Sequence, residues 1–176
     1  MLYPQILLGL VATVSAIDSY FHLGENCDGP AIVCTGLNPD VCCTASASNS
    51  VGYRGIPLDW SISTTAFTGG GCTNYGNRGS ASGSNFICMP RCCGNAGYSG
   101  TKYRFGSKKR SEIEGEALTG TEEEEEEDKP CTSSQKANQL VLVDGTKYDI
   151  VDLDDDNLNQ LVCCATLNYP LRQVYF

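Results

Sequence analysis

The chain has 176 residues, of which eleven are cysteines and one is a histidine, and its formal net charge is −9 at pH 7. A single histidine leaves almost no material for a nucleophile–histidine–acid triad or for histidine-based metal sites. For an acidic chain of this kind we also expect no nucleic-acid partner.

Residues 1–16 form a short apolar run that ends in Val-Ser-Ala, the small residues that signal peptidase requires. We expect a signal peptide that is removed after Ala16, so that the mature chain begins near Ile17. The run is too short to remain in a bilayer, which predicts no stable membrane insertion. The sequence therefore predicts a secreted, extracellular protein.

Every cysteine lies after this leader, in the part of the chain that meets an oxidising compartment. All of them are candidate disulfide partners: Cys27, Cys34, Cys42, Cys43, Cys72, Cys88, Cys92, Cys93, Cys131, Cys163 and Cys164. Because eleven is odd, one sulfur remains, and two alternatives stay open: a disulfide-linked dimer, or a buried or incidental thiol. Glycine- and serine-rich stretches leave little for a large core, so disulfides of roughly 2–4 kcal/mol each are expected to supply much of the stability.

Residues 17–107 are expected to form a cysteine-rich β domain. Short apolar and aromatic runs bounded by turn-forming residues are typical of short strands, and they occur at 53–56, 60–67, 85–89 and 98–105. The glycines at 69–71 and the polar stretch after them predict turns or exposed loops. The first half is therefore interpreted as small and all-β.

One run in this half, at 98–105, contains both aromatic and basic side chains. A candidate binding edge is formed by Tyr98, Lys102, Tyr103 and Arg104. Rings stack on apolar faces and cations pair with anionic groups, so such an edge would suit a sugar or a phosphate. The alternative is a strand with one face in the core and one face in solvent.

A basic triplet and an acidic tract separate the two halves, at residues 108–130. Residues 17–110 carry eight Lys/Arg against five Asp/Glu, whereas residues 111–176 carry four against sixteen. Lys109 and Arg110 form a dibasic site of the kind that kexin-type proteases cut; the alternative is a solvated turn that is never cut. The acidic tract has almost nothing apolar to bury, which predicts a disordered linker.

Residues 131–176 are expected to form a β-hairpin followed by a helix, so the whole chain is predicted to be mainly β or small α+β. Two apolar runs flank Asp144-Gly145, a dipeptide that suits a two-residue primed turn. Acidic residues at 154–156 predict a capped helix N-terminus. One apolar stripe would follow on this helix, formed by Leu158, Leu161, Val162 and Ala165.

No motif in the chain predicts catalysis, a metal site or a cofactor. Alternate aspartates from Asp152 to Asp156 resemble the start of a calcium loop, but Asn157 stands where that loop requires glycine. A helix cap explains the same residues. His22 is expected to be an exposed residue in a mobile N-terminal segment, with no assigned task. We therefore expect a protein that is not an enzyme.

The layout of leader, paired cysteines and glycine- and serine-rich body resembles that of small cysteine-rich secreted proteins of fungi. The likeness rests on residues 27–105, through Cys-Asp-Gly-Pro at 27–30, Cys42-Cys43, Ile56-Pro57 with Trp60, and Gly70-Gly71-Cys72. Many of these proteins are effectors, so the resemblance implies a non-enzymatic, effector- or toxin-like binder of a host or competitor target. The basic triplet also resembles that of two-chain killer-toxin precursors, which implies processing around a linker.

A second likeness is to hydrophobins, whose cysteines run single, pair, single, single, pair, single. That order is followed by Cys34, Cys42-Cys43, Cys72, Cys88, Cys92-Cys93 and Cys131. The last two intervals differ from the hydrophobin pattern, and three cysteines are surplus. This resemblance implies the alternative function, a cell-wall or surface-active structural protein.

Overall fold

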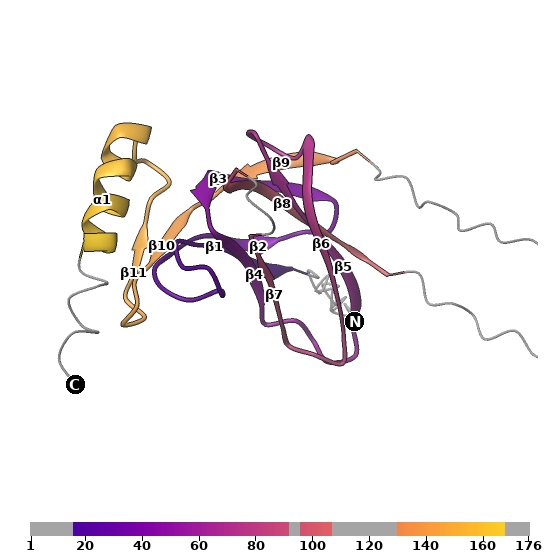
Figure 1. Cartoon of the computed structure of the whole chain (residues 1–176). Helices are drawn as coiled ribbons and strands as arrows, with labels where there is room; N and C mark the ends of the chain where they lie inside the picture. Colours follow the sequence, from indigo (N-terminus) through magenta and orange to yellow (C-terminus); the bar gives the residue numbers. More distant parts are fainter. Residues whose placement is uncertain (1–15, 92–95, 107–129, 168–176) are drawn as a thin grey trace, which may run out of the picture.

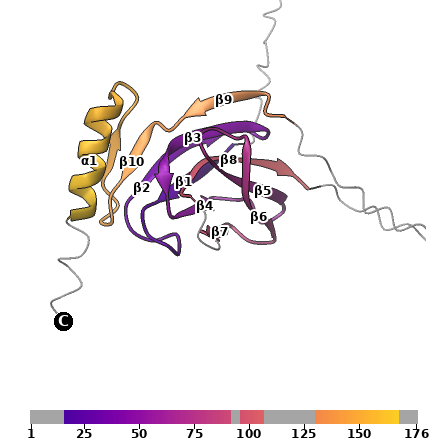
Figure 2. The ribbon, with the colours of Figure 1, turned by 45° about the horizontal axis from the view of Figure 1, so that its top comes forward.

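The computed structural model of the chain describes residues 16–91, 96–106 and 130–167. In this part of the chain, eleven strands form two β-sheets, and one helix follows them (Figure 1). The sheets pack face to face, and the helix lies beside β10 (Figure 2) and β11 (Figure 1). The prediction of a mainly β, disulfide-rich fold with a C-terminal hairpin and helix is confirmed.

The first sheet has six strands in the order β11-β10-β2-β1-β4-β7, all antiparallel to their neighbours. Its strands are β1 (Ile17–His22), β2 (Ala31–Leu37), β4 (Ser50–Arg54), β7 (Phe86–Pro90), β10 (Gln139–Val141) and β11 (Lys147–Asp149).

The second sheet has five strands in the order β6-β5-β8-β3-β9, and only its β3–β9 pair is parallel. Its strands are β3 (Val41–Ser48), β5 (Ser61–Thr68), β6 (Asn74–Ser82), β8 (Tyr98–Phe105) and β9 (Ser133–Lys136). The helix α1 (Asp155–Leu167) completes the described chain.

One continuous core fills the space between the sheets. Alternate residues of a strand share one face, so Phe21 and Val51 point inward from the first sheet, while Ala66 and Tyr103 point inward from the second. The glycine- and serine-rich stretches of the sequence predicted little material for a hydrophobic core. Burial of these apolar side chains nevertheless gives the protein a continuous core between the sheets.

The strands that follow the acidic tract complete both sheets. β9 pairs with β3 through Ser133 and Val41, and β10 pairs with β2 through Leu140 and Ile32. Because these pairings are long-range, no local pattern in the sequence predicts them. The described residues on both sides of the acidic tract therefore contribute strands to the same two sheets.

Among the described residues, three disulfides cross-link the sandwich, and they include six of the predicted cysteines. Cys34–Cys43 joins β2 to β3 through the core, and therefore links the two sheets. Adjacent strand residues point to opposite faces, so Cys42 points outward and bonds to Cys72. Cys27–Cys88 lies on the outer face of the first sheet and fixes the loop after β1 to β7.

The predicted hairpin and helix cap are present, with one change in the turn. Leu142 N–H donates to the Thr146 carbonyl at 2.9 Å, and Gly145 has φ of 85°. The loop therefore has three residues with a left-handed glycine, and not the expected two-residue turn. Asp154 caps α1, because its carboxylate accepts the Asn157 N–H at 2.8 Å.

The glycine-rich stretch that predicted a loop after residue 71 contains an edge strand, β6. Backbone pairing with β5 needs no apolar side chains, and the small residues allow close approach. A Cβ at Gly79 would lie 2.7 Å from the Ile87 side chain, so a larger residue there would have to displace the end of that side chain.

Several predictions fall outside the described residues. They concern residues 1–15 of the expected signal peptide, the cysteines Cys92 and Cys93, the cleavage site at Lys109 and Arg110, and the acidic tract. Each of these stays a prediction.

Candidate functional site

The predicted binding edge is not an edge. Tyr98, Lys102 and Tyr103 lie on β8, the middle strand of the second sheet, and all three are buried. The Tyr103 hydroxyl donates to the Leu37 carbonyl at 3.1 Å, and burial raises the pKa of this phenol to about 12. Only Arg104 is partly exposed. Tyr98 and Tyr103 therefore pack in the core, and the Lys102 ammonium lies over the Phe67 ring, 5.6 Å from its centroid.

An exposed cation stacked on rings lies at the end of β4. The Arg54 guanidinium carbon is 4.7 Å from the ring centroid of Phe86 and 5.4 Å from that of Tyr20. Arg54 Nη2 also donates to the Cys27 carbonyl at 3.3 Å, which ties the cation to a disulfide-bonded loop. The arrangement holds a positive charge in place at the surface of the first sheet.

An exposed ring and a half-buried ring lie at the junction of β5 and β8. The Trp60 ring packs edge-on against Phe105, with 4.8 Å between their centroids. Phe105 remains 44% exposed and Leu58 remains 65% exposed. Gly55, with φ of 73°, lets the chain turn away from β4 into the loop that carries Leu58 and Trp60.

Strand register places these two groups at the same end of the sandwich. β4 ends where β7 begins, because Arg54 pairs with Phe86. β5 begins where β8 ends, because Ile62 pairs with Phe105, and residues 55–60 connect β4 to β5. We call the following set the aromatic end: Arg54, Leu58, Trp60, Phe86 and Phe105.

Sequence reasoning missed the aromatic end as a binding surface. A signal was present, since large apolar residues stood beside turn-forming ones: Leu58 follows Pro57, and Phe86 follows Asn85. Apolar side chains at strand ends have less chance of burial than those in strand centres. The five residues offer rings and one guanidinium, which suit recognition by stacking and charge pairing.

The single histidine is buried, contrary to the expectation of an exposed residue in a mobile segment. His22 is 4% exposed, because it ends β1, which pairs with both β2 and β4. Burial, with a smaller effect from the Arg54 charge, lowers the pKa of His22 to about 4. The ring is therefore neutral at pH 7 and stacks on Tyr20, with 5.7 Å between centroids.

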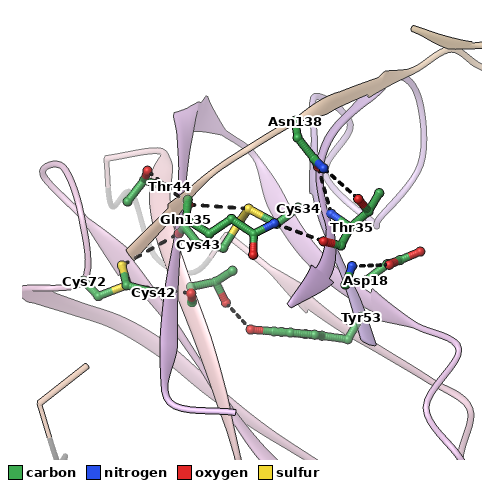
Figure 3. The surroundings of a disulfide bond; sticks show 12 residues. Asp18, Cys34, Thr35, Cys42, Cys43, Thr44, Tyr53, Cys72, Gln135 and Asn138 are labelled. Atoms are coloured by element: carbon green, nitrogen blue, oxygen red, sulfur yellow. Dashed lines mark hydrogen bonds between the residues drawn. A yellow bond between two sulfur atoms is a disulfide. The ribbon is translucent and has the colours of Figure 1, made fainter. Parts of the chain in front are cut away.

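Three sulfurs come together on the outer face of the second sheet. The Sγ atoms of Cys42, Cys72 and Cys131 all lie within 4.8 Å of one another, and Figure 3 shows the first two beside β3. Three thiolates would suit a soft metal ion. Two of these sulfurs form a disulfide and are not thiolates, so the donor set does not fit a metal. The arrangement suits a reaction between a thiol and a disulfide instead.

Comparison with known proteins gives the family. A family model described as an N-terminal domain, ARB_05566_N, matches residues 18–138, which include the whole aromatic end. The chain belongs to the ARB_05566_N family. An uncharacterized secreted protein of Arthroderma benhamiae is 23% identical over 165 residues, which are 90% of this chain and 80% of that protein. No solved structure matches the chain.

Membership of this family confirms part of the predictions. The chain is a secreted, disulfide-rich protein of a fungal secreted family, and its localisation is extracellular. Within the described ranges, no helix combines the length and the hydropathy that crossing a bilayer requires. The likenesses to killer-toxin precursors and to hydrophobins stay predictions.

Proposed function

We propose that the protein is a non-enzymatic, effector- or toxin-like binder of a host or competitor target, and that the aromatic end contacts an anionic glycan on that target. One observation carries the proposal: exposed rings and a ring-stacked guanidinium share one end of a stapled sandwich. Flat rings stack on the apolar faces of sugars, and a guanidinium pairs with carboxylates or sulfates.

The aromatic end is held in shape before any ligand arrives. Arg54 is fixed between the Tyr20 and Phe86 rings and bonded to the Cys27 carbonyl. The Trp60 ring packs against Phe105, and the backbone N–H of Trp60 donates to the Pro57 carbonyl at 3.0 Å. Binding to a pre-formed surface avoids the entropy cost of ordering it, which favours recognition through few contacts.

The charge of the chain also favours an anionic partner at this end. Residues 17–110, which contain the whole aromatic end, carry eight Lys/Arg against five Asp/Glu. The acidic residues are concentrated after this part of the chain. Attraction between exposed charges is screened by salt, so binding is expected to weaken at high ionic strength.

The proposal is tested with immobilised heparin as an anionic glycan and dextran as a neutral control. We expect retention on heparin only, and its loss at about 0.5 M NaCl, where screening is strong. Leu58→Asp and Phe105→Ser should each weaken binding about tenfold, which corresponds to about 1.4 kcal/mol.

Val143→Asp is the matched control, because Val143 is 60% exposed and lies on the β10–β11 turn at the opposite edge of the first sheet. It adds the same charge as Leu58→Asp and should leave retention unchanged. Equal losses from both substitutions would show that net charge, and not the aromatic end, controls binding. A protein that ignores heparin but lowers the tension of an air–water interface would support the surface-active alternative instead.

A further inference from the structure

The three-sulfur cluster joins parts of the chain that lie far apart in sequence. Cys42 belongs to β3, Cys72 lies in the loop after β5, and Cys131 precedes β9. Their Sγ atoms lie within 4.8 Å of one another, although Cys42 and Cys72 already form a disulfide. A third sulfur this close to a disulfide is within reach of thiol–disulfide exchange after a small side-chain rotation.

Backbone pairing fixes the position of the third sulfur. Thr132, the neighbour of Cys131, donates its N–H to the Asp40 carbonyl at 2.9 Å, and β9 then runs parallel to β3. The Thr132 hydroxyl donates to the same carbonyl at 3.2 Å. The proximity of Cys131 to Cys42 is therefore set by the fold of the second sheet and not by one side-chain rotamer.

We propose that Cys131 exchanges with the Cys42–Cys72 disulfide and so forms a covalent clasp between the strands before and after the acidic tract. The Cys131 thiolate attacks one sulfur of the bridge, a new S–S bond forms, and the other sulfur leaves as a thiolate that takes up a proton. The number of disulfides is unchanged, so the step needs no oxidant or reductant.

Cys131 and one sulfur of the bridge, that of Cys72, are accessible for this reaction. Cys131 and Cys72 are partly exposed, and Cys72 follows three consecutive glycines, Gly69–Gly71, all of which have positive φ. Such a backbone adapts easily when its sulfur is released. Bonding of Cys131 to either Cys42 or Cys72 ties residues 131–167 covalently to the body of the sandwich.

The clasp determines whether a cut at the predicted cleavage site separates the two segments. This inference does not depend on the proposed glycan binding. Among the described residues, backbone pairing of β9 with β3 and of β10 with β2 would join the two segments after a cut at Arg110, and the clasp would add a covalent link to it. After exchange, the segments stay together under denaturing conditions until a reductant is added.

Disulfide mapping of the intact secreted protein tests the clasp. Trypsin places Cys131 on peptide 111–136, Cys72 on peptide 55–78, and Cys42 on the peptide that ends at Arg54. The protein is held at pH 6 or pH 8, thiols are then blocked with N-ethylmaleimide, and the digest is analysed without reduction. We expect 111–136 joined to one of the other two peptides, forming roughly 75-fold faster at pH 8 than at pH 6, because attack requires the thiolate and an ordinary thiol is mostly protonated at both pH values.

Two variants make the outcome decisive. Cys131→Ser should abolish every species that joins 111–136 to another peptide, while Cys163→Ser, which removes a cysteine on α1, should leave the exchange intact. The proposal is overturned if 111–136 is never joined to the peptides of Cys42 or Cys72, or is joined only to the peptides of Cys92–Cys93 or Cys163–Cys164.

Discussion

The hydroxyl of Tyr53 and the hydroxyl of Thr101 are hydrogen-bonded across the two sheets, with 2.7 Å between their oxygens. Thr101 donates its only hydroxyl hydrogen to the Thr65 carbonyl at 2.9 Å, so Tyr53 is the donor in the first bond. Burial raises the pKa of Tyr53 above its usual value, which keeps the phenol protonated. A polar chain therefore crosses the apolar core from β4 to β5.

Substitution of the donor and substitution of the acceptor of this hydrogen bond should lower the unfolding free energy by unequal amounts. Tyr53→Phe leaves Thr101 bonded to Thr65 and should cost about 1 kcal/mol of unfolding free energy. Thr101→Val leaves the Tyr53 hydroxyl buried without its acceptor and should cost about 2–3 kcal/mol. Guanidinium denaturation measures both, and the double variant should cost less than the sum. If the loss of unfolding free energy in the double variant equals the sum of the two single losses, the two hydroxyls are not coupled.

The stability of the fold should fall on acidification through His22. The unfolded histidine takes up a proton below pH 6.5, whereas the buried ring does so only near pH 4. Between these values the unfolded state binds more protons, so stability present above pH 6.5 is lost as the pH falls to about 4. The separation of the two pKa values corresponds to roughly 3 kcal/mol. Chemical denaturation at several pH values measures the loss.

His22→Gln is the control for this pH dependence, because it removes the only histidine of the chain. The variant should show a nearly flat stability between pH 6.5 and pH 5, where carboxylates contribute little. If the wild type and the variant lose stability in parallel over this range, His22 is not the group responsible.

The Cys27–Cys88 disulfide should control the acidity of His22. A Cβ on Gly52 would lie 3.4 Å from the Cys27 sulfur and 3.5 Å from His22 Nε2, so sulfur and imidazole share one small space. The Cys27→Ser/Cys88→Ser variant should let water reach the ring and raise the pKa of His22 from about 4 towards 6.5. The single imidazole resonance in a proton NMR titration reports this directly. An unchanged midpoint in a folded variant would contradict the shielding role of the bridge.

Gly100→Ala should destabilise the protein through the loop after β5. A Cβ at this position would collide with the Gly71 carbonyl and the Cys72 backbone nitrogen, and the Cys42–Cys72 bridge holds that loop in place. We expect a loss of roughly 2 kcal/mol, typical of overpacking. In a background without the Cys42–Cys72 bridge the loop is able to retreat, so the loss should be smaller. Thermal or chemical denaturation of both backgrounds measures the difference.

Gly106→Ala is the matched control for Gly100→Ala. Its nearest neighbour would be the Ser61 hydroxyl at 3.1 Å, which moves by side-chain rotation. The substitution should therefore change stability by less than about 0.5 kcal/mol. Equal losses at both positions would show that loss of glycine flexibility, and not the loop contact, is responsible.

Locally determined elements could be predicted from the sequence. β8 occupies the predicted run 98–105, and the Asp154 cap and the hairpin depend on residues close together in the chain. β2 was missed for a physical reason: Val33 and Cys34 are both fully buried on opposite faces, so the strand shows no alternation of polar and apolar residues.

The candidate site could not be predicted because it depends on pairing at long range. Arg54 and Phe86 meet only through the register of β4 and β7, and Trp60 meets Phe105 through that of β5 and β8. These strand registers cannot be predicted from residues that are neighbours in the sequence. The same applies to the sulfur cluster, where Cys42 and Cys131 approach through the parallel β3–β9 pair.

Fluorescence of Trp60 during titration with heparin tests the central claim most directly. Trp60 is the only tryptophan of the chain, and its ring packs on Phe105 within the aromatic end. We expect a saturable change in its emission whose midpoint Leu58→Asp moves to about tenfold higher heparin concentration and Val143→Asp leaves unchanged. Heparin binding that leaves the emission of Trp60 unchanged would contradict the account, because the glycan would then be held away from the aromatic end.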